Sequence, residues 1–355
     1  MKFCTIFSKM FVMIIKMASL KHRTESVRHV NRALFAMICF VFAFSANLFA
    51  QEQKTVYKPV IDGDWHNITS QPDLGELSGP KQEPVDFGVW QASDGTWQLW
   101  SCIRGTKTGG KGRLFYRWEG KSLSDTAWKP MGIAMEADTA LNENRGGLQA
   151  PYVLKEKGVY YMFYGDWESI CLATSKDGKT FTRVINETKT PALFAGPLYN
   201  TRDPMVLKIG DTYYCYYAAH HLVDNKSKTS QGAIFCRTSK DLKVWGYPKI
   251  VARGGSALAQ TSWFGGDVEC PFVVKVADKY VLFRNQRYGK NALNMQYCSS
   301  DPLNFGDEND DYLVGQLPVA APEIVKVGDQ YYIVALKPGL DGMRIAKLKF
   351  VKEVK

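Results

Sequence analysis

The stretch that decides the fold is Arg202-Asp203-Pro204-Met205-Val206-Leu207, which continues through the turn Gly210-Asp211 into Tyr213-Tyr214-Cys215-Tyr216-Tyr217. A polar opening leads into an apolar run, and a short turn separates that run from an aromatic one. Two apolar, aromatic-rich runs that flank such a turn predict a β-hairpin. We therefore take the hairpin as the unit to search for elsewhere in the chain.

Three further segments repeat this hairpin, and they open with Gln149-Ala150-Pro151, Glu269-Cys270-Pro271 and Ala320-Ala321-Pro322. Each passes through a turn that contains Gly or Asp into an aromatic strand, which begins at Tyr160, Tyr280 or Tyr331. The four prolines are spaced by 53, 67 and 51 residues. A long repeat period of this kind predicts a repeat architecture and is not expected of a β-sandwich.

A fifth, degenerate copy lies upstream, from Asp86-Phe87-Gly88 to Trp97-Gln98-Leu99-Trp100. Asp86 stands eleven residues before Trp97, as the first residue of each other copy stands eleven before its tyrosine. We therefore expect Asp86 to be equivalent to Gln149, Arg202, Glu269 and Ala320.

Most copies are followed by a second pair of strands, such as Ile170–Ser175 and Ile234–Ser239. Four antiparallel strands in each of five units predict an all-β, five-bladed β-propeller. We expect residues 51–355 to form this single catalytic domain.

The first fifty residues are expected to be a targeting segment. They carry seven Lys/Arg and one acid, followed by an apolar run at residues 33–44 that fits the core of a secretory signal. Cleavage after Ala50 predicts export to the periplasm or the cell exterior; an uncleaved membrane anchor is the alternative. Removing the segment lowers the net charge from +10 to +4, which does not indicate a nucleic-acid partner. We expect a monomer without a stable membrane span.

Six cysteines follow residue 50: Cys102, Cys171, Cys215, Cys236, Cys270 and Cys298. Their spacings are wide, no Cys-x-x-Cys occurs, and most lie inside apolar runs. This pattern predicts buried free thiols and argues against a structural zinc site. We expect neither a metal ion nor a cofactor.

The first strand of each propeller blade lines the central channel, so the openings of the five copies should meet there. They bring Asp86, Gln149, Arg202, Asp203, Glu269 and Glu323 towards one funnel. Glycoside hydrolysis needs a protonated carboxyl to assist the leaving oxygen and an ionised one to activate water or attack the anomeric carbon. Acids from three separate blades therefore predict a glycosidase with a carbohydrate substrate.

At these residues the chain resembles the five-bladed glycoside hydrolases of families 43 and 32, over roughly residues 80–350. Arg202-Asp203-Pro204 and Glu269-Cys270-Pro271 are similar to motifs of family 32, and residues 173–178 are similar to family 43. The resemblance implies that Glu269 is the general acid, and apolar neighbours such as Phe272, Trp263 and Phe264 would raise its pKa. It implies that Asp203 orients the acid or binds sugar hydroxyls, and that Arg202 contributes to substrate binding by holding a carboxylate or hydroxyl in place.

The resemblance also implies that Asp86 is the base or nucleophile, although Asp86-Phe87 stands where Asp-Pro is expected. Asp62 and Asp64 are alternatives for this role. The family 32 opening Asn-Asp-Pro is absent, and we expect no β-sandwich after the propeller, so family 43 is the nearer resemblance. It implies inversion; a retaining, family 32-like fructosidase is the alternative.

Further candidates for substrate binding are Gln149 and Glu323 at the blade openings, Trp167 as a platform for a sugar ring, His220 with His221, and Arg284. Asp267, Arg145 and Asn285 are weaker candidates. We expect the enzyme to release a terminal sugar from a polysaccharide or oligosaccharide. A sugar-binding propeller without catalysis and a protein-interaction scaffold are the competing interpretations.

Overall fold

The computed structural model describes residues 54–355, except residues 225, 227 and 258–267. The expected targeting segment, residues 1–50, lies outside the described residues, as do Trp263, Phe264 and Asp267. In the described part, the helices are short 3₁₀ turns, and none is long and apolar enough to cross a bilayer.

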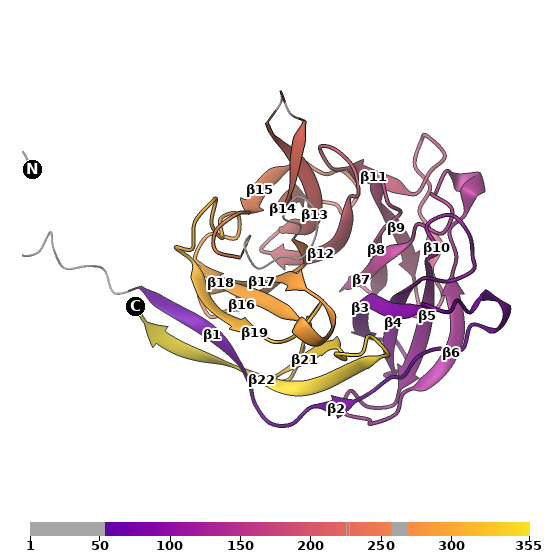
Figure 1. Ribbon diagram of the computed structural model, residues 1–355, viewed down its shortest axis with the longest axis horizontal. Helices are drawn as coiled ribbons and strands as arrows, with labels where there is room; N and C mark the ends of the chain where they lie inside the picture. The colour runs from indigo at the N-terminus through magenta and orange to yellow at the C-terminus, as the bar shows by residue number, and fades with distance from the viewer. Residues whose placement is uncertain (1–53, 225, 227, 258–267) are drawn as a thin grey trace, which may run out of the picture. The chain divides into compact units, whose positions relative to one another are not determined.

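Five antiparallel sheets surround a central channel, which confirms the expected five-bladed β-propeller (Figure 1). Blade 1 consists of β3 (Glu83–Gln91), β4 (Trp97–Arg104), β5 (Leu114–Gly120) and β6 (Lys129–Met135). Blade 2 consists of β7 (Gln149–Glu156), β8 (Val159–Gly165), β9 (Ser169–Ser175) and β10 (Thr182–Arg183), with β11 (Ala192–Ala195) as an extra partner of β9.

The remaining blades follow in chain order. Blade 3 consists of β12 (Arg202–Ile209), β13 (Thr212–Asp224), β14 (Thr229–Ser239) and β15 (Lys249–Ala252). Blade 4 consists of β16 (Glu269–Val276), β17 (Lys279–Arg287), β18 (Leu293–Ser299) and β19 (Leu313–Leu317). Blade 5 contains β20 (Glu323–Val327), β21 (Gln330–Leu336) and β22 (Met343–Val354), with β2 (His66–Asn67) at the edge of β22.

The ring is closed by β1 (Thr55–Ile61), the first strand of the propeller, which forms the outer strand of blade 5. It pairs antiparallel with β22 from Thr55–Val354 to Ile61–Leu348. Asp62 follows β1, and its carboxylate forms an ion pair with the exposed Lys349. Asp62 therefore lies at the outer edge of blade 5, away from the channel, and is not an alternative to Asp86.

A residue with positive φ recurs near the start of the inner strand in every blade, with φ of 35° at Asp86, 43° at Ala150, 58° at Asp203, 46° at Cys270 and 45° at Ala321. In blades 1 to 4 it lies in a β-bulge, whereas Ala321 in blade 5 lies just before β20. In blade 1, the pairs Val85–Cys102 and Phe87–Ser101 leave Asp86 unpaired between them.

The bulges correct the predicted register by one residue. Asp86 is equivalent to Asp203 and Cys270, not to Arg202 and Glu269. Counting eleven residues from the aromatic strand gave the wrong equivalence for Asp86, because the turn of blade 1 has five residues between the paired Gln91 and Trp97. The other blades turn in two residues, as between Glu156 and Val159 in blade 2.

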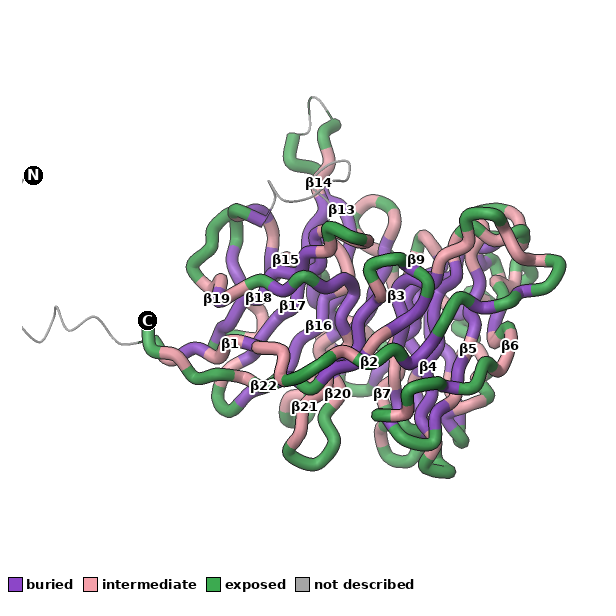
Figure 2. The backbone as a smooth tube through the Cα atoms, turned by 60° about the horizontal axis from the view of Figure 1, so that its bottom comes forward, coloured by how far each residue is buried: buried purple, intermediate pink, exposed green. Residues whose placement is uncertain are grey.

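Buried residues follow the strands of the propeller (Figure 2), and the apolar core combines aliphatic with aromatic side chains. Trp118, Tyr164 and Phe283 are among the largest fully buried side chains. All six cysteines after residue 50 are free, and all except the half-buried Cys270 are buried, which confirms the prediction of unpaired thiols.

Candidate active site

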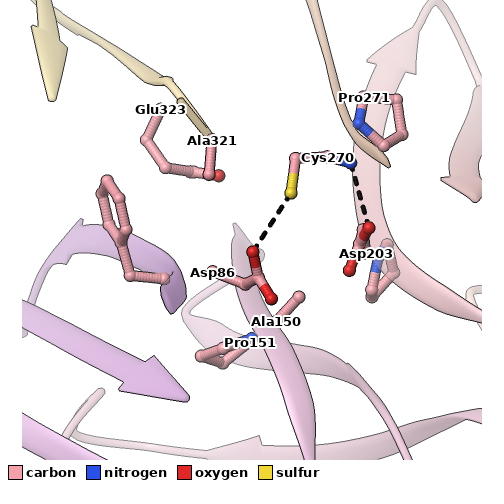
Figure 3. Close-up of a pocket in the computed structure, with 10 residues that line it drawn as sticks. Asp86, Ala150, Pro151, Asp203, Cys270, Pro271, Ala321 and Glu323 are labelled. Atoms are coloured by element: carbon pink, nitrogen blue, oxygen red, sulfur yellow. Dashed lines mark hydrogen bonds between the residues drawn. The ribbon is translucent and has the colours of Figure 1, made fainter. Parts of the chain in front are cut away.

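The five positive-φ residues surround a pocket at the mouth of the channel. Its walls are supplied by all five blades, and its lining residues are Asp86, Phe87, Ala150, Pro151, Asp203, Pro204, Cys270, Pro271, Ala321 and Glu323 (Figure 3). A β-bulge re-aims the side chain at the bulged position. Since Asp86, Asp203 and Cys270 are bulged residues, the strands aim two carboxylates and a thiol into this pocket.

Aspartate adopts a positive φ with little strain, whereas alanine and cysteine do so at a cost of about 1 kcal/mol each. Ala150, Cys270 and Ala321 nevertheless take this conformation. The strain is therefore imposed by the propeller geometry and repeated at each blade, and it places the pocket walls independently of which side chain is present.

Arg202 connects the two acids of blades 3 and 4. Its Nε and Nη2 both lie 2.9 Å from Glu269 Oε1, and its Nε lies 3.8 Å from Asp203 Oδ2. The guanidinium is almost fully buried, and its Nη1 donates to the carbonyl oxygen of Asn200. A buried, always-charged Arg that contacts both groups holds Glu269, which is not among the lining residues, next to Asp203, which is one of them. The structure therefore brings Glu269 and Asp203 together, as the sequence predicted.

Cys270 connects blade 4 to the other two acids. Its backbone N–H donates to Asp203 Oδ2 over 3.0 Å, and its thiol donates to Asp86 Oδ1 over 3.3 Å (Figure 3). Asp86, Asp203 and Glu269 therefore belong to one connected cluster, although 183 positions separate the first from the last.

Tyr288 is a site residue that the sequence analysis missed. Its hydroxyl donates to Asp86 Oδ1 over 2.5 Å and lies 3.0 Å from Cys270 Sγ. Tyr288 follows β17, where no repeat marks it, so the only available signal was its place just after an inner hairpin. Two donors on one oxygen hold the Asp86 carboxylate in a fixed orientation.

The electrostatics of the pocket favour protonated forms. Burial, together with the nearby charges of Asp86 and Glu269, raises the pKa of Asp203 well above its usual value, although Arg202 opposes this shift. Burial and the same carboxylates also raise the pKa values of the Cys270 thiol and the Tyr288 hydroxyl. Both groups therefore act as hydrogen-bond donors at neutral pH.

Glu269 is the first residue of β16, and its side chain is 20% exposed. It is the most accessible of the three acids, since Asp86 and Asp203 are 8% and 5% exposed. A general acid must reach the leaving oxygen, which requires such access.

Glu323 and Gln149 were predicted to bind substrate. Glu323 lines the pocket from blade 5, and burial raises its pKa well above the usual value. Gln149 is buried at the start of β7, and its amide nitrogen lies 3.3 Å from Asn200 Oδ1. Asn200 thus connects Gln149 to Arg202.

The structure does not place Arg284 and His220 in the pocket. Arg284 is buried on blade 4, donates to the carbonyl oxygen of Gly254 and lies over the Tyr297 ring. His220 is buried beneath Tyr199, whose ring stacks on it at 4.8 Å and is half exposed. Tyr199, on the segment between β11 and β12, therefore presents a half-exposed aromatic ring above His220, and the sequence analysis did not single it out.

Other predicted residues also lie outside the pocket. Asn285 is buried and accepts a hydrogen bond from the backbone of Ala321, which is a structural role. Arg145 is exposed on the segment before β7. Trp167 has both Lys111 and Arg113 against its ring, at 4.4 and 5.1 Å from the centroid. In the part of the chain that is described, no group of three or more His, Cys, Asp or Glu is arranged to hold a metal ion.

A five-bladed propeller with three carboxylates joined at the channel mouth defines the class of carbohydrate-active propellers that use acid/base chemistry. The model of the glycosyl hydrolases family 32 N-terminal domain matches residues 115–332. The chain belongs to this family and is a glycosidase. A comparison with curated protein sequences finds no match.

Solved structures share the fold. A thermostable family-43 glycoside hydrolase superposes with a TM-score of 0.55 at 19% identity, covering 78% of this chain and 94% of its own. An endo-arabinase from Bacteroides thetaiotaomicron superposes with a TM-score of 0.53 at 14% identity, covering 79% of this chain and 98% of its own. A Bombyx mori GH32 beta-fructofuranosidase superposes with a TM-score of 0.52 at 15% identity, covering 85% of this chain and 62% of its own.

Proposed function

We propose that this glycosidase releases a terminal sugar from a poly- or oligosaccharide, with Glu269 as the general acid and Asp86 as the ionised carboxylate that faces the anomeric carbon. The observation that carries the proposal is the connected cluster in which Arg202 and Cys270 join acids from three blades. The two roles need two carboxyls with different access and surroundings, as these have.

The roles follow from the contacts of each group. Glu269 donates its proton to the glycosidic oxygen as the bond from that oxygen to the anomeric carbon breaks. Asp86, oriented by Tyr288, supplies negative charge on the other side of the sugar. Asp203, whose pKa is raised, is a protonated donor that hydrogen-bonds a sugar hydroxyl.

For the stereochemical course we propose retention. The sequence resemblance led us to expect inversion, but the match to the family 32 model supports the retaining alternative. In this course Asp86 attacks the anomeric carbon and forms a glycosyl ester while the leaving group takes the proton of Glu269. Glu269 then removes a proton from water, the water oxygen attacks the anomeric carbon, and the Asp86 carboxylate is released.

A screen of aryl glycosides (arabinofuranoside, xyloside, galactoside and fructoside) with the wild type and Glu269→Gln tests the proposal. We expect turnover of at least one substrate by the wild type, and its loss in the variant with binding retained. A folded wild type that binds oligosaccharides without any turnover would be a sugar-binding protein and would contradict the proposal. Proton NMR of the first-formed anomer decides between retention and inversion.

We further propose that the protein is exported to the periplasm or the cell exterior. The basic and apolar pattern of residues 1–50 supports this location. Cell fractionation with mass spectrometry of the mature N-terminus tests it, and we expect a chain that begins near Gln51. Recovery of the whole chain in the cytoplasm would contradict export.

A further inference from the structure

The loop between β4 and β5 carries basic residues to the mouth of the channel. Residues 104–113 include Arg104, Lys107, Lys111 and Arg113 and no acid. The loop joins the ends of β4 and β5 that lie beside the start of β3, as the pair Val85–Cys102 shows. Its cations therefore lie at the same end of blade 1 as Asp86.

Backbone contacts hold this loop rigidly. The N–H groups of Lys111 and Arg113 donate to the carbonyl oxygens of Arg145 and Gly146, both over 2.9 Å. A Cβ on Gly110 would lie 1.9 Å from the carbonyl oxygen of Arg145, so only glycine fits this close approach. The positions of Lys111 and Arg113 are therefore fixed before any ligand arrives, which lowers the entropic cost of binding.

The two cations meet at Trp167, which blade 2 presents in the turn between β8 and β9. Lys111 Nζ and the Arg113 guanidinium carbon lie 4.4 and 5.1 Å from the Trp167 ring centroid. Trp167 has a φ of 85°, which is unfavourable for a tryptophan and shows that its position is imposed by its surroundings. Because the cations contact the ring, Trp167 is better suited to hold positive charges in place than to stack on a sugar.

No carboxylate in the described part of the chain forms an ion pair with Lys111 or Arg113. The charges of Asp86 and Glu269 act on Arg113 from farther away, and its side chain donates to Cys102 Sγ over 3.7 Å. Arg104, in contrast, is paired with Glu83 at 2.6 Å. Two like charges against one ring repel each other, and the ring offsets this only in part. An incoming oxyanion would relieve the repulsion.

We propose that Lys111, Arg113 and Trp167 form a subsite for an oxyanion of the substrate, so that the enzyme acts on glycans with acidic sugars, either carboxylated or sulfated. The planar guanidinium of Arg113 suits the two oxygens of such a group, and Lys111 adds an exposed point charge. Arg113 connects this subsite to the acids, since Cys102 pairs with Val85 next to Asp86. This inference rests on the proposed function and names its substrate class.

The test measures binding to the full-length Glu269→Gln protein by calorimetry, so that it does not depend on turnover. The probes are galacturonate trisaccharide, a sulfated galactose disaccharide and neutral xylotriose. We expect at least one acidic probe to bind about tenfold more tightly than xylotriose at low salt, an advantage that salt reduces. Lowering the pH below about 3.5 should abolish carboxylate binding but spare sulfate binding, which distinguishes the two sources.

A second substitution, Lys111→Gln, should reduce the preference for the acidic probe several-fold. Lys107→Gln is the matched control, because Lys107 is exposed on the same loop but does not contact Trp167. Equal binding of acidic and neutral probes would overturn the subsite, as would an equal loss in both lysine variants. Neither result bears on the aryl glycoside screen, which alone tests the proposed function.

Discussion

Tyr288 donates a 2.5 Å hydrogen bond to Asp86 across 202 positions of sequence, from the connection between β17 and β18 in blade 4 to the inner strand of blade 1. The bond crosses the channel mouth and fixes the oxygen that also accepts from the Cys270 thiol. Its geometry makes Tyr288 a positioning residue for the carboxylate that faces the anomeric carbon.

Tyr288→Phe should lower kcat about tenfold while KM changes little, because a hydrogen bond to a charged group contributes roughly 1.5–3 kcal/mol. Steady-state kinetics on the best aryl glycoside measure the effect. Tyr297→Phe is the matched control: its hydroxyl is buried on the same sheet and has no hydrogen-bond partner in the described structure. An unchanged kcat in Tyr288→Phe, or an equal fall in both variants, would contradict the positioning role.

Arg202→Met should destabilise the protein by about 1–3 kcal/mol at pH 7, because it removes the buried guanidinium and leaves the oxygens of Glu269 and Asp203 without the N–H groups that contact them. Urea denaturation followed by tryptophan fluorescence measures the loss. Lys349→Met removes the exposed pair with Asp62 and should cost less than about 1 kcal/mol. Similar losses in the two variants would show that Arg202 does not bind a buried charge cluster.

Glu323→Gln should stabilise the protein at alkaline pH. Burial raises the pKa of Glu323 in the folded state, so the folded protein holds this proton more tightly than the unfolded chain. The resulting stabilisation is complete below the unfolded pKa of about 4.3 and is lost as pH rises through the raised folded pKa.

The advantage in Tm of Glu323→Gln over the wild type should therefore grow between pH 4 and pH 8, to about 2 °C or more. Differential scanning calorimetry across this range measures it. The exposed Glu76→Gln serves as the control and should show no such trend. An advantage that shrinks with pH would reverse the assigned direction of the shift.

The six cysteines of the propeller should resist alkylation in the folded protein. Burial raises the pKa of the Cys215 and Cys236 thiols, and that of Cys270 is raised by burial and by the carboxylates around it, so little thiolate forms at pH 8. Iodoacetamide labelling with peptide mass spectrometry should find these positions modified only after unfolding. Rapid labelling of Cys270 in the native state would show that its thiol is ionised.

The sequence predicts the blades well because each blade carries a recognisable pattern within a short stretch of sequence. Proline after the positive-φ residue and aromatic residues after the turn recur with the period of the fold, and both features are present in blades 2 to 5. Blade 1 has Phe87 in place of proline and a longer turn, so counting residues misplaced its register even though it selected Asp86. A bulge shifts the register of strand pairing without changing the type of residues in the strand, so the spacing between motifs in the sequence does not reveal it.

The site could be predicted only where the repeat carries it. Asp86, Asp203 and Glu269 lie on inner strands, and symmetry alone brings them together. Tyr288, Tyr199 and Arg113 lie on connecting segments or at strand ends, whose paths depend on packing between different blades. Arg284 and His220 lie on second strands, where neighbouring residues alternate between faces, so their proximity in sequence to the inner hairpin did not indicate where they point.

The pairing of β1 with β22 joins the earliest strand of the propeller to its last. During synthesis, residues 55–61 therefore emerge nearly three hundred residues before their partner strand. Until β22 has been made, the backbone N–H and C=O groups of β1 have no strand to pair with. Such an edge is prone to intermolecular pairing. Intermolecular pairing of this strand must therefore be avoided until β22 has been synthesised.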